Sequence, residues 1–168
     1  SVASGKLLQG RIAPSIRGSV RVADRDDSSR VYLRSGQWDS GFVYLRPGIR
    51  NHWELKVTDD LPLALRLWMA FAEGELALEA VEVTRVDLDG AFNDFRLHLG
   101  PTSADTVVSL EGAFNRLELV VSSDTPVRVS TDGFINIVDR RKNARSLSGP
   151  AYQLRADGAF NQIVVRSK

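Results

Sequence analysis

The sequence contains no cysteine among its 168 residues. It therefore has no disulfide framework, no thiolate metal site and no cysteine nucleophile. Only two histidines occur, His52 and His98, and neither lies in a zinc-ligand spacing or near a G-x-S-x-G elbow. We therefore expect no catalysis through histidine, no metal site and no cofactor.

The sequence also has little net charge. Its 22 Lys and Arg residues stand against 21 Asp and Glu residues, and a formal charge of +1 gives no reason to expect nucleic acid as a partner. The charge is uneven, because residues 1–50 carry nine basic and four acidic side chains while the remainder carries 13 and 17. The apolar fraction of 43% and the charged fraction of 26% are typical of a globular domain.

Long hydrophobic runs are missing as well. The best candidate, Leu61 to Leu78, is shorter than the roughly 20 apolar residues of a membrane helix and contains Arg66, Glu73 and Glu75. It is therefore not read as a transmembrane segment. The chain begins at Ser1 and its one methionine is Met69, which indicates a piece of a longer protein whose flanking segments would decide membrane proximity.

What the sequence does contain is a repeated pentapeptide. It reads DGAFN at residues 89–93, EGAFN at 111–115, DGFIN at 132–136 and DGAFN again at 157–161. The glycines of successive copies are 22, 21 and 25 residues apart. These bend glycines are Gly90, Gly112, Gly133 and Gly158.

Each copy lies between two segments of alternating polarity. Val86 and Leu88 precede the first copy with Asp87 between them, and Phe95 and Leu97 follow it. Such alternation is typical of a strand with one buried face. Each unit therefore reads as strand, bend and strand, with Asp-Gly supplying the bend because glycine adopts positive φ without steric cost.

Two all-β architectures fit this unit. In a stack of β-hairpins the flanking strands would pair with each other, which would give a sandwich. In a β-solenoid of the single-stranded parallel β-helix type, each copy is one coil, and equivalent residues of successive coils lie about 4.8 Å apart. The nearly fixed period favours the solenoid, because hairpins have no need of identical corners.

Stacked coils would place the large apolar residues of the bends in one column and the asparagines in another. Each amide would then hydrogen-bond to the next, because a buried amide needs hydrogen-bond partners and the equivalent amide of the neighbouring coil can provide them. We interpret both columns as structural rather than as a ligand site. Their members are Phe92, Phe114, Ile135 and Phe160, and Asn93, Asn115, Asn136 and Asn161.

A third column would be acidic, because a carboxylate precedes every bend glycine. The simpler interpretation is that these side chains point into solvent or bond the amides of their own turns. The alternative is a strip that binds cations or sugars, as in a carbohydrate-active or carbohydrate-binding β-helix. The four residues are Asp89, Glu111, Asp132 and Asp157.

The sequence predicts two regions, a basic, irregular and strand-rich cap over residues 1–52 and a solenoid over residues 53–168. An upstream coil is expected where Leu63, Leu65 and Leu67 alternate with other residues before a bend at Glu73–Glu75; a helix is the rival here.

The spacing of 25 residues predicts a loop from Asp139 to Tyr152. Its basic residues would be solvated or would contact phosphates, lipid headgroups or an acidic partner. They are Arg140, Arg141, Lys142 and Arg145.

The run that starts WELKV at Trp53 resembles a known family. Its glycine-centred bends and the strand PVRV at Pro126 to Val129 are similar to those of toastrack domains of the adhesin-like DUF4097 and DUF2154 type, which include the C-terminal domain of LiaF and YvqF proteins of bacterial envelope stress. The resemblance covers about two thirds of the chain and leaves out residues 1–50. It implies a solenoid-like fold in a bacterial envelope-associated protein and transfers no catalytic residues.

These observations predict a non-catalytic interaction or scaffold domain, adhesin-like in character. Its partner would be a protein, or another copy bound through exposed coil ends or sheet edges. Carbohydrate binding through the acidic column is the competing hypothesis. The side of the membrane is left open by the sequence.

Overall fold

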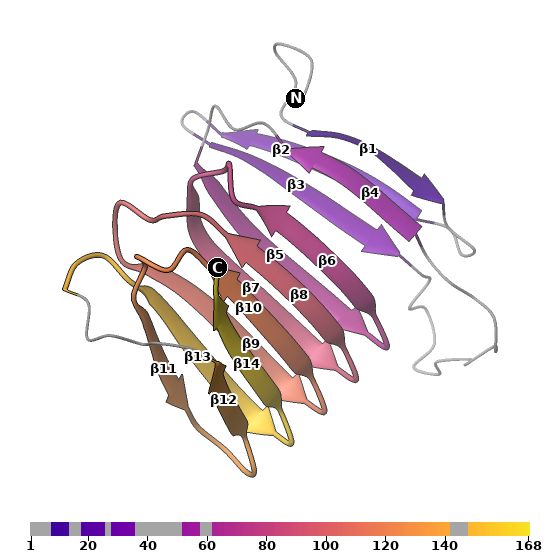
Figure 1. Cartoon of the computed structure of the whole chain (residues 1–168). Helices are drawn as coiled ribbons and strands as arrows, with labels where there is room; N and C mark the ends of the chain where they lie inside the picture. The colour runs from indigo at the N-terminus through magenta and orange to yellow at the C-terminus, as the bar shows by residue number, and fades with distance from the viewer. Residues whose placement is uncertain (1–7, 14–17, 26–27, 36–51, 58–61, 142–147) are drawn as a thin grey trace. The chain divides into compact units, whose positions relative to one another are not determined.

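The computed structural model describes residues 8–13, 18–25, 28–35, 52–57, 62–141 and 148–168. The chain divides into two compact units, Ser1–Thr58 and Asp59–Lys168. Every element that the structure describes is a β-strand (Figure 1). Nowhere in these ranges is there a helix with the length and apolar character needed to cross a membrane.

The first unit contains two antiparallel strand pairs. They are β1 (Leu8–Ala13) with β4 (His52–Val57), and β2 (Gly18–Arg25) with β3 (Ser28–Ser35). Trp53, at which the family resemblance begins, lies in β4 and is level with Ile12 of β1. That residues 1–52 cap the first coil stays a prediction.

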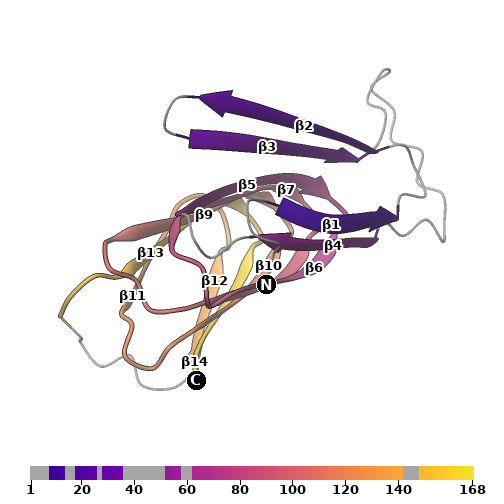
Figure 2. The ribbon, with the colours of Figure 1, turned by 90° about the horizontal axis from the view of Figure 1, so that it is seen from above.

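The second unit is a parallel β-solenoid made of two five-stranded sheets, which excludes the hairpin stack (Figure 1). One sheet contains, in spatial order, β5 (Leu63–Ala70), β7 (Val83–Ala91), β9 (Thr106–Ala113), β13 (Tyr152–Ala159) and β11 (Val127–Thr131). The other contains β6 (Glu73–Leu78), β8 (Asp94–Leu99), β10 (Arg116–Val121), β14 (Gln162–Ser167) and β12 (Ile137–Arg141). The β5 sheet and the β6 sheet form two layers, which Figure 2 shows from above.

The coils do not stack in the order of the sequence. The C-terminal coil β13–β14 lies between β9–β10 and β11–β12. After β10 the chain leaves one position of the stack empty and forms β11–β12 beyond it. It then returns after β12 and fills that position with β13–β14. This return accounts for the longest glycine spacing. The predicted loop assignment was wrong in part, because Arg140 and Arg141 belong to β12, opposite Val165 and Arg166. Lys142 and Arg145 lie outside the described residues.

The upstream coil is present, but its bend was misplaced by the sequence prediction. Leu63–Ala70 forms strand β5 with strictly alternating burial, so the helical alternative is excluded. The bend lies at Phe71, with a φ of 56°, rather than at Glu73–Glu75. Gly74 is inside β6, where a Cβ would lie 2.7 Å from a ring carbon of Phe95. This glycine makes room for a core side chain.

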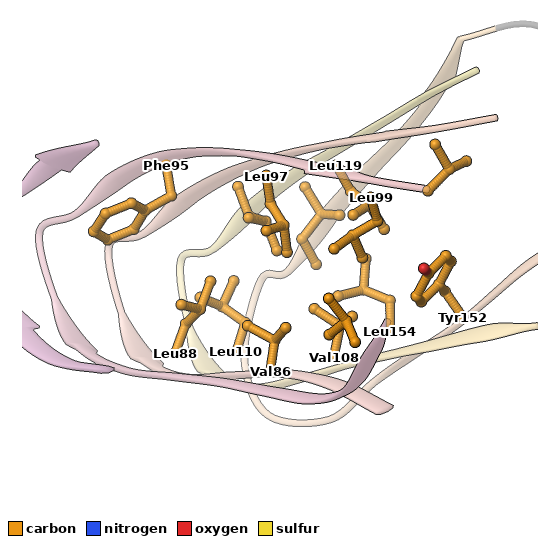
Figure 3. Packing of buried hydrophobic residues seen from close by; sticks show 14 of the residues in the cluster. Val86, Leu88, Phe95, Leu97, Leu99, Val108, Leu110, Leu119, Tyr152 and Leu154 are labelled. Atoms are coloured by element: carbon orange, nitrogen blue, oxygen red, sulfur yellow. The ribbon is translucent and has the colours of Figure 1, made fainter. Parts of the chain in front are cut away.

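The hydrophobic core lies between the two sheets of the solenoid. Val86 and Leu88 of β7 face Leu97 and Leu99 of β8, and the same pairing recurs in the neighbouring coils (Figure 3). Each side chain of this size that is fully buried stabilises the fold by about 1.5–3 kcal/mol. Within this core cluster, the side chains with no exposed surface are Val86, Leu97, Val108, Leu117, Leu119, Leu154 and Ile163.

Tyr152 adds a titratable group to this core. It is only 1% exposed, and its hydroxyl donates a hydrogen bond to the carbonyl oxygen of Gly100 at 2.9 Å. Burial raises the pKa of Tyr152 to about 12. The charged phenolate is disfavoured because it would lose its hydration.

We expect the stability of the protein to fall as the pH rises from about 10 to about 12. An unfolded tyrosine ionises near pH 10, whereas folded Tyr152 keeps its proton up to a pH of about 12. The stabilisation is therefore complete below the unfolded pKa and is lost as the pH passes through the folded one. Urea unfolding across this range should show the decline, and Tyr152→Phe should remove it. An identical alkaline decline in the variant would contradict the assignment.

Candidate functional site

The corner that joins the two sheets is made by phenylalanine rather than by Asp-Gly. Phe92 and Phe114 have φ values of 59° and 58°, in the left-handed region, whereas Asp89 and Gly90 lie within strand β7. The predicted positive φ of the bend glycines is confirmed, with 137° at Gly90, but the prediction that Asp-Gly supplies the turn itself was wrong. A side chain other than glycine in this conformation costs about 1–2 kcal/mol, and it recurs at Phe71, Ile135 and Phe160.

The recurrence of the bend glycines has a second cause besides positive φ, which is the close approach of neighbouring coils. At Gly112, where φ is +119°, a Cβ would lie 1.9 Å from the carbonyl oxygen of Gly90 in the next coil. A Cβ on Gly158 would likewise lie 1.9 Å from the carbonyl oxygen of Gly112. Only a residue without a side chain fits between these backbones.

On the inner side of the corner the asparagines form a continuous ladder. The Oδ1 atom of Asn115 accepts hydrogen bonds from the backbone N and the Nδ2 of Asn93 at 3.1 and 3.0 Å. Its Nδ2 donates to the carbonyl oxygen of Gly90 at 3.0 Å. Asn161 bonds to Asn136 in the same manner. The ladder follows the spatial order Asn93, Asn115, Asn161, Asn136 and thus differs from the sequence order.

On the outer side of the corner the phenylalanine rings form a stacked column. The ring centroids of Phe71, Phe92, Phe114 and Phe160 are 4.9 Å apart from one coil to the next, and the rings are parallel within 7°. Phe134 meets Phe160 edge-on, at 5.7 Å. The four stacked side chains are 43–54% exposed. We call this column, with the corner that carries it, the aromatic corner.

Two members of this surface were absent from the sequence prediction. Phe71 was overlooked because the residue after it is Ala72, so the copy lacks the asparagine of the pentapeptide. The alternating leucines before it were the available signal. Phe134 precedes Ile135, which occupies the corner position of the terminal coil with a φ of 52°.

A groove of about 470 Å³ runs along the aromatic corner. Phenylalanine rings form one side of it, and charged side chains at the start of β6, β8 and β10 form the other. Its lining residues are Phe71, Ala72, Glu73, Phe92, Asn93, Asp94, Phe114 and Arg116. Arg116 lies 3.7 Å from a carboxylate oxygen of Asp94.

The acidic column lies on the other flank of the corner, on the outer face of the β5 sheet. Asp132 accepts a hydrogen bond from the backbone N of Gly133 at 2.7 Å, and Glu111 accepts one from Ser109 Oγ at 3.3 Å. A second groove, of about 500 Å³, brings these carboxylates near guanidinium groups. Its charged lining residues are Arg85, Glu111, Asp132, Arg155 and Asp157. Within the described ranges no cluster of three or more His, Asp or Glu residues could hold a metal ion.

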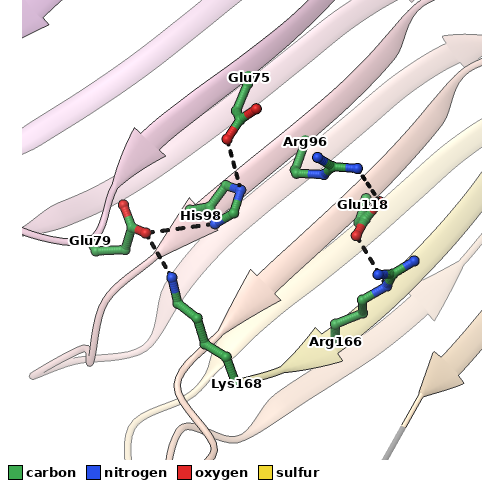
Figure 4. Close-up of polar contacts among 7 residues, drawn as sticks. All are labelled: Glu75, Glu79, Arg96, His98, Glu118, Arg166 and Lys168. Carbon is green, nitrogen blue, oxygen red and sulfur yellow. Dashed lines mark hydrogen bonds and ion pairs between the residues drawn. The ribbon is translucent and has the colours of Figure 1, made fainter.

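The outer face of the β6 sheet carries a network of ion pairs (Figure 4). His98 lies between Glu75 and Glu79, with nitrogen-to-oxygen distances of 3.3 and 3.6 Å. Lys168 donates a hydrogen bond to Glu79 at 2.8 Å, and this bond lowers the pKa of Glu79. Among the described residues no serine hydroxyl hydrogen-bonds to His98. The imidazole therefore lies with both ring nitrogens toward carboxylates.

Glu118 is the buried centre of a neighbouring ion-pair group (Figure 4). Its carboxylate is 3.2 Å from Arg96 and 3.0 Å from Arg166, which lie on the strands at either side. Both arginines are about half exposed. The two guanidinium groups compensate the desolvation of the carboxylate and link β8, β10 and β14.

Residues 3–112 match the family model described as the N-terminal domain of toast_rack, DUF2154. This match spans more than half of the chain. The chain belongs to the toast_rack family. The family match includes most of residues 1–50, which the sequence resemblance had left out, and it ends at the bend glycine Gly112. No protein with a curated description matches the toast_rack chain.

A solved structure shares the fold of this toast_rack protein. It is the crystal structure of a "putative cell adhesion protein" from Clostridium sporogenes, and it superposes with a TM-score of 0.81. The superposition covers 98% of this chain and 84% of the other, at 15% sequence identity. At this identity the likeness concerns the fold alone.

Proposed function

We propose that this toast_rack chain is a non-catalytic interaction domain of a bacterial cell-envelope protein. It acts as a rigid, adhesin-like scaffold that presents the aromatic corner to a macromolecular partner. The solenoid holds the corner in place through its Asn ladder and parallel strands, so that little conformational entropy is lost on binding.

The observation that carries this proposal is the exposure of the phenylalanine column. Each ring presents about half of its surface to solvent, and each is held in a left-handed conformation that asparagine or glycine would adopt at lower cost. Stacking recovers about 0.5–1.5 kcal/mol per pair. A strained, exposed, apolar column is typical of a contact surface rather than of a purely structural corner.

Family and fold support the location and the kind of activity. The chain belongs to the toast_rack family, which the sequence resemblance linked to bacterial envelope proteins, and the Clostridium sporogenes structure of the same fold is described as a "putative cell adhesion protein". The surroundings of His98 support a role without catalysis, because its ring nitrogens face carboxylates and, among the described residues, no hydroxyl is hydrogen-bonded to them.

The proposal is tested by cosedimentation of the purified chain with intact bacterial cells and with isolated cell envelopes. The test variant is Phe92→Asn combined with Phe114→Asn, since asparagine tolerates the left-handed conformation at these positions. The matched control is Ser130→Ala combined with Arg155→Ala, in the second groove. Truncating central aromatic contacts should weaken adhesion at least about tenfold, while the control variant should adhere normally. Equal adhesion of the wild type and the corner variant would overturn the proposal.

Carbohydrate binding is a second candidate, favoured by the second groove. Carboxylates and guanidinium groups line it together, and such groups hydrogen-bond to sugar hydroxyls. In this case the Ser130→Ala and Arg155→Ala variant would lose adhesion, soluble oligosaccharides would compete, and the corner variant would still bind.

A further inference from the structure

The aromatic corner is flanked on both sides by rows of charged side chains. On the β5 sheet, Asp89, Glu111 and Asp157 are in register on adjacent strands, and Asp132 follows at the same level. On the β6 sheet the equivalent row is Glu73, Asp94 and Arg116. Six carboxylates thus stand against one guanidinium, which gives the two rows a net charge of minus five. All but Asp89 are exposed.

The other arginines near these rows have partners of their own. Arg66 lies over the ring of Trp68 at 4.6 Å, and Arg85 forms an ion pair with Asp87 at 2.8 Å. Arg155, in the second groove, donates a hydrogen bond to the side-chain oxygen of Gln153 at 3.3 Å. Within the described residues, Glu73, Asp89 and Asp157 take part in no ion pair. The apolar column is therefore bordered by carboxylates that are available to a partner.

We propose that the aromatic corner binds a peptide segment that carries both cationic and apolar side chains. This inference rests on the proposed function and specifies the partner. Apolar side chains of the segment would pack on the exposed edges of the phenylalanine rings, and lysine or arginine side chains would reach the carboxylates on either flank. Three ring spacings of 4.9 Å define the column, so an extended segment of about five residues, rising roughly 3.3 Å per residue, covers it.

The same charges argue against two other occupants. A membrane surface rich in anionic lipid would be repelled by both rows. A second copy that met this corner face to face would bring carboxylates against carboxylates, and like charges across an interface are destabilising.

The experiment measures fluorescence anisotropy of labelled peptides of about ten residues with the purified chain. The probes are an alternating Lys–Leu peptide, a Glu–Leu peptide and a Lys–Ser peptide. The variants are Phe92→Asn with Phe114→Asn, and Glu111→Lys with Asp157→Lys. The matched control is Glu82→Lys with Asp124→Lys, which makes the same change of net charge at exposed carboxylates outside the two rows.

We expect the Lys–Leu peptide to bind more tightly than either other peptide, and more weakly as salt is raised. Each test variant should weaken this binding at least about fivefold, as expected when a few charge pairs or ring contacts are removed, and the control should change it less than about twofold. No binding of the Lys–Leu peptide, equal binding of the Glu–Leu peptide, or equal loss in the control would overturn the proposal. So would corner-dependent binding to vesicles containing phosphatidylglycerol, or corner-dependent dimers, in place of peptide binding.

Failure of this inference is distinguishable from failure of the proposed function. If the corner variant loses adhesion to cells but no cationic peptide binds, only the partner class is wrong. If the corner variant adheres as the wild type does, the aromatic corner is not the contact surface.

Discussion

Replacing Gly112 by alanine should destabilise the solenoid by more than about 4 kcal/mol, or prevent it from folding. The added Cβ would lie 1.9 Å from the carbonyl oxygen of Gly90 and 2.9 Å from its carbonyl carbon. Both atoms belong to the backbone of a neighbouring coil that is fixed by parallel pairing of β7 and β9. The clash can be relieved only by separating the coils, which breaks hydrogen bonds and opens the core. Urea unfolding followed by circular dichroism measures the loss.

Gly149→Ala is the matched control for this experiment. Gly149 has a φ of +128°, close to that of Gly112, but no atom lies within 4 Å of its added Cβ. The control therefore contains the backbone strain without the clash and should cost about 1–2 kcal/mol. Equal effects at the two positions would show that conformational strain, and not the contact between coils, is the reason for glycine at position 112.

Replacing Asn115 by alanine should cost about 3–5 kcal/mol of the free energy of unfolding. Asn115 is 2% exposed, and its amide has three hydrogen-bonding partners: the backbone N and the Nδ2 of Asn93 and the carbonyl oxygen of Gly90. Alanine would leave these groups buried and unpaired, at about 1–3 kcal/mol each, with water replacing a part of the loss. The same urea experiment measures the change.

The ladder itself provides the matched control, at its end. Asn136 belongs to the terminal coil and is half-buried, so water can reach the groups that Asn136→Ala would leave unpaired. We expect a cost below about 2 kcal/mol there. At the opposite end the chain has Ala72 in place of asparagine, with its backbone N donating to Asn93 Oδ1 at 3.0 Å. A cost at Asn136 equal to that at Asn115 would contradict the account.

Much of the solenoid could be predicted from local sequence. The alternation around Val86, Leu88, Phe95 and Leu97 predicts strands that bury one face, and the structure has these side chains in the core. The corner geometry could not be derived in the same way. Asp-Gly is a common turn signal, and Gly90 does have a positive φ of 137°, but the chain turns at Phe92, and the glycine also leaves room for the backbone of another coil. The sequence of one repeat does not show which of its residues contact the neighbouring coil.

The repeat, its period and the buried face of each strand follow from the sequence alone, because they depend on contacts within one coil or on a simple stack of equal coils. The position of the corner and the order of the coils became known only from the folded chain. The third copy has Thr131 and Arg140 at positions that are level with Ala156 and Val165, and a polar side chain at such a position is best accommodated at an open end. The more apolar C-terminal coil occupies the interior instead, since burial there removes more apolar surface from water. Which coil lies inside the stack depends on the total apolar surface of each coil, and this total cannot be seen in any short stretch of the sequence.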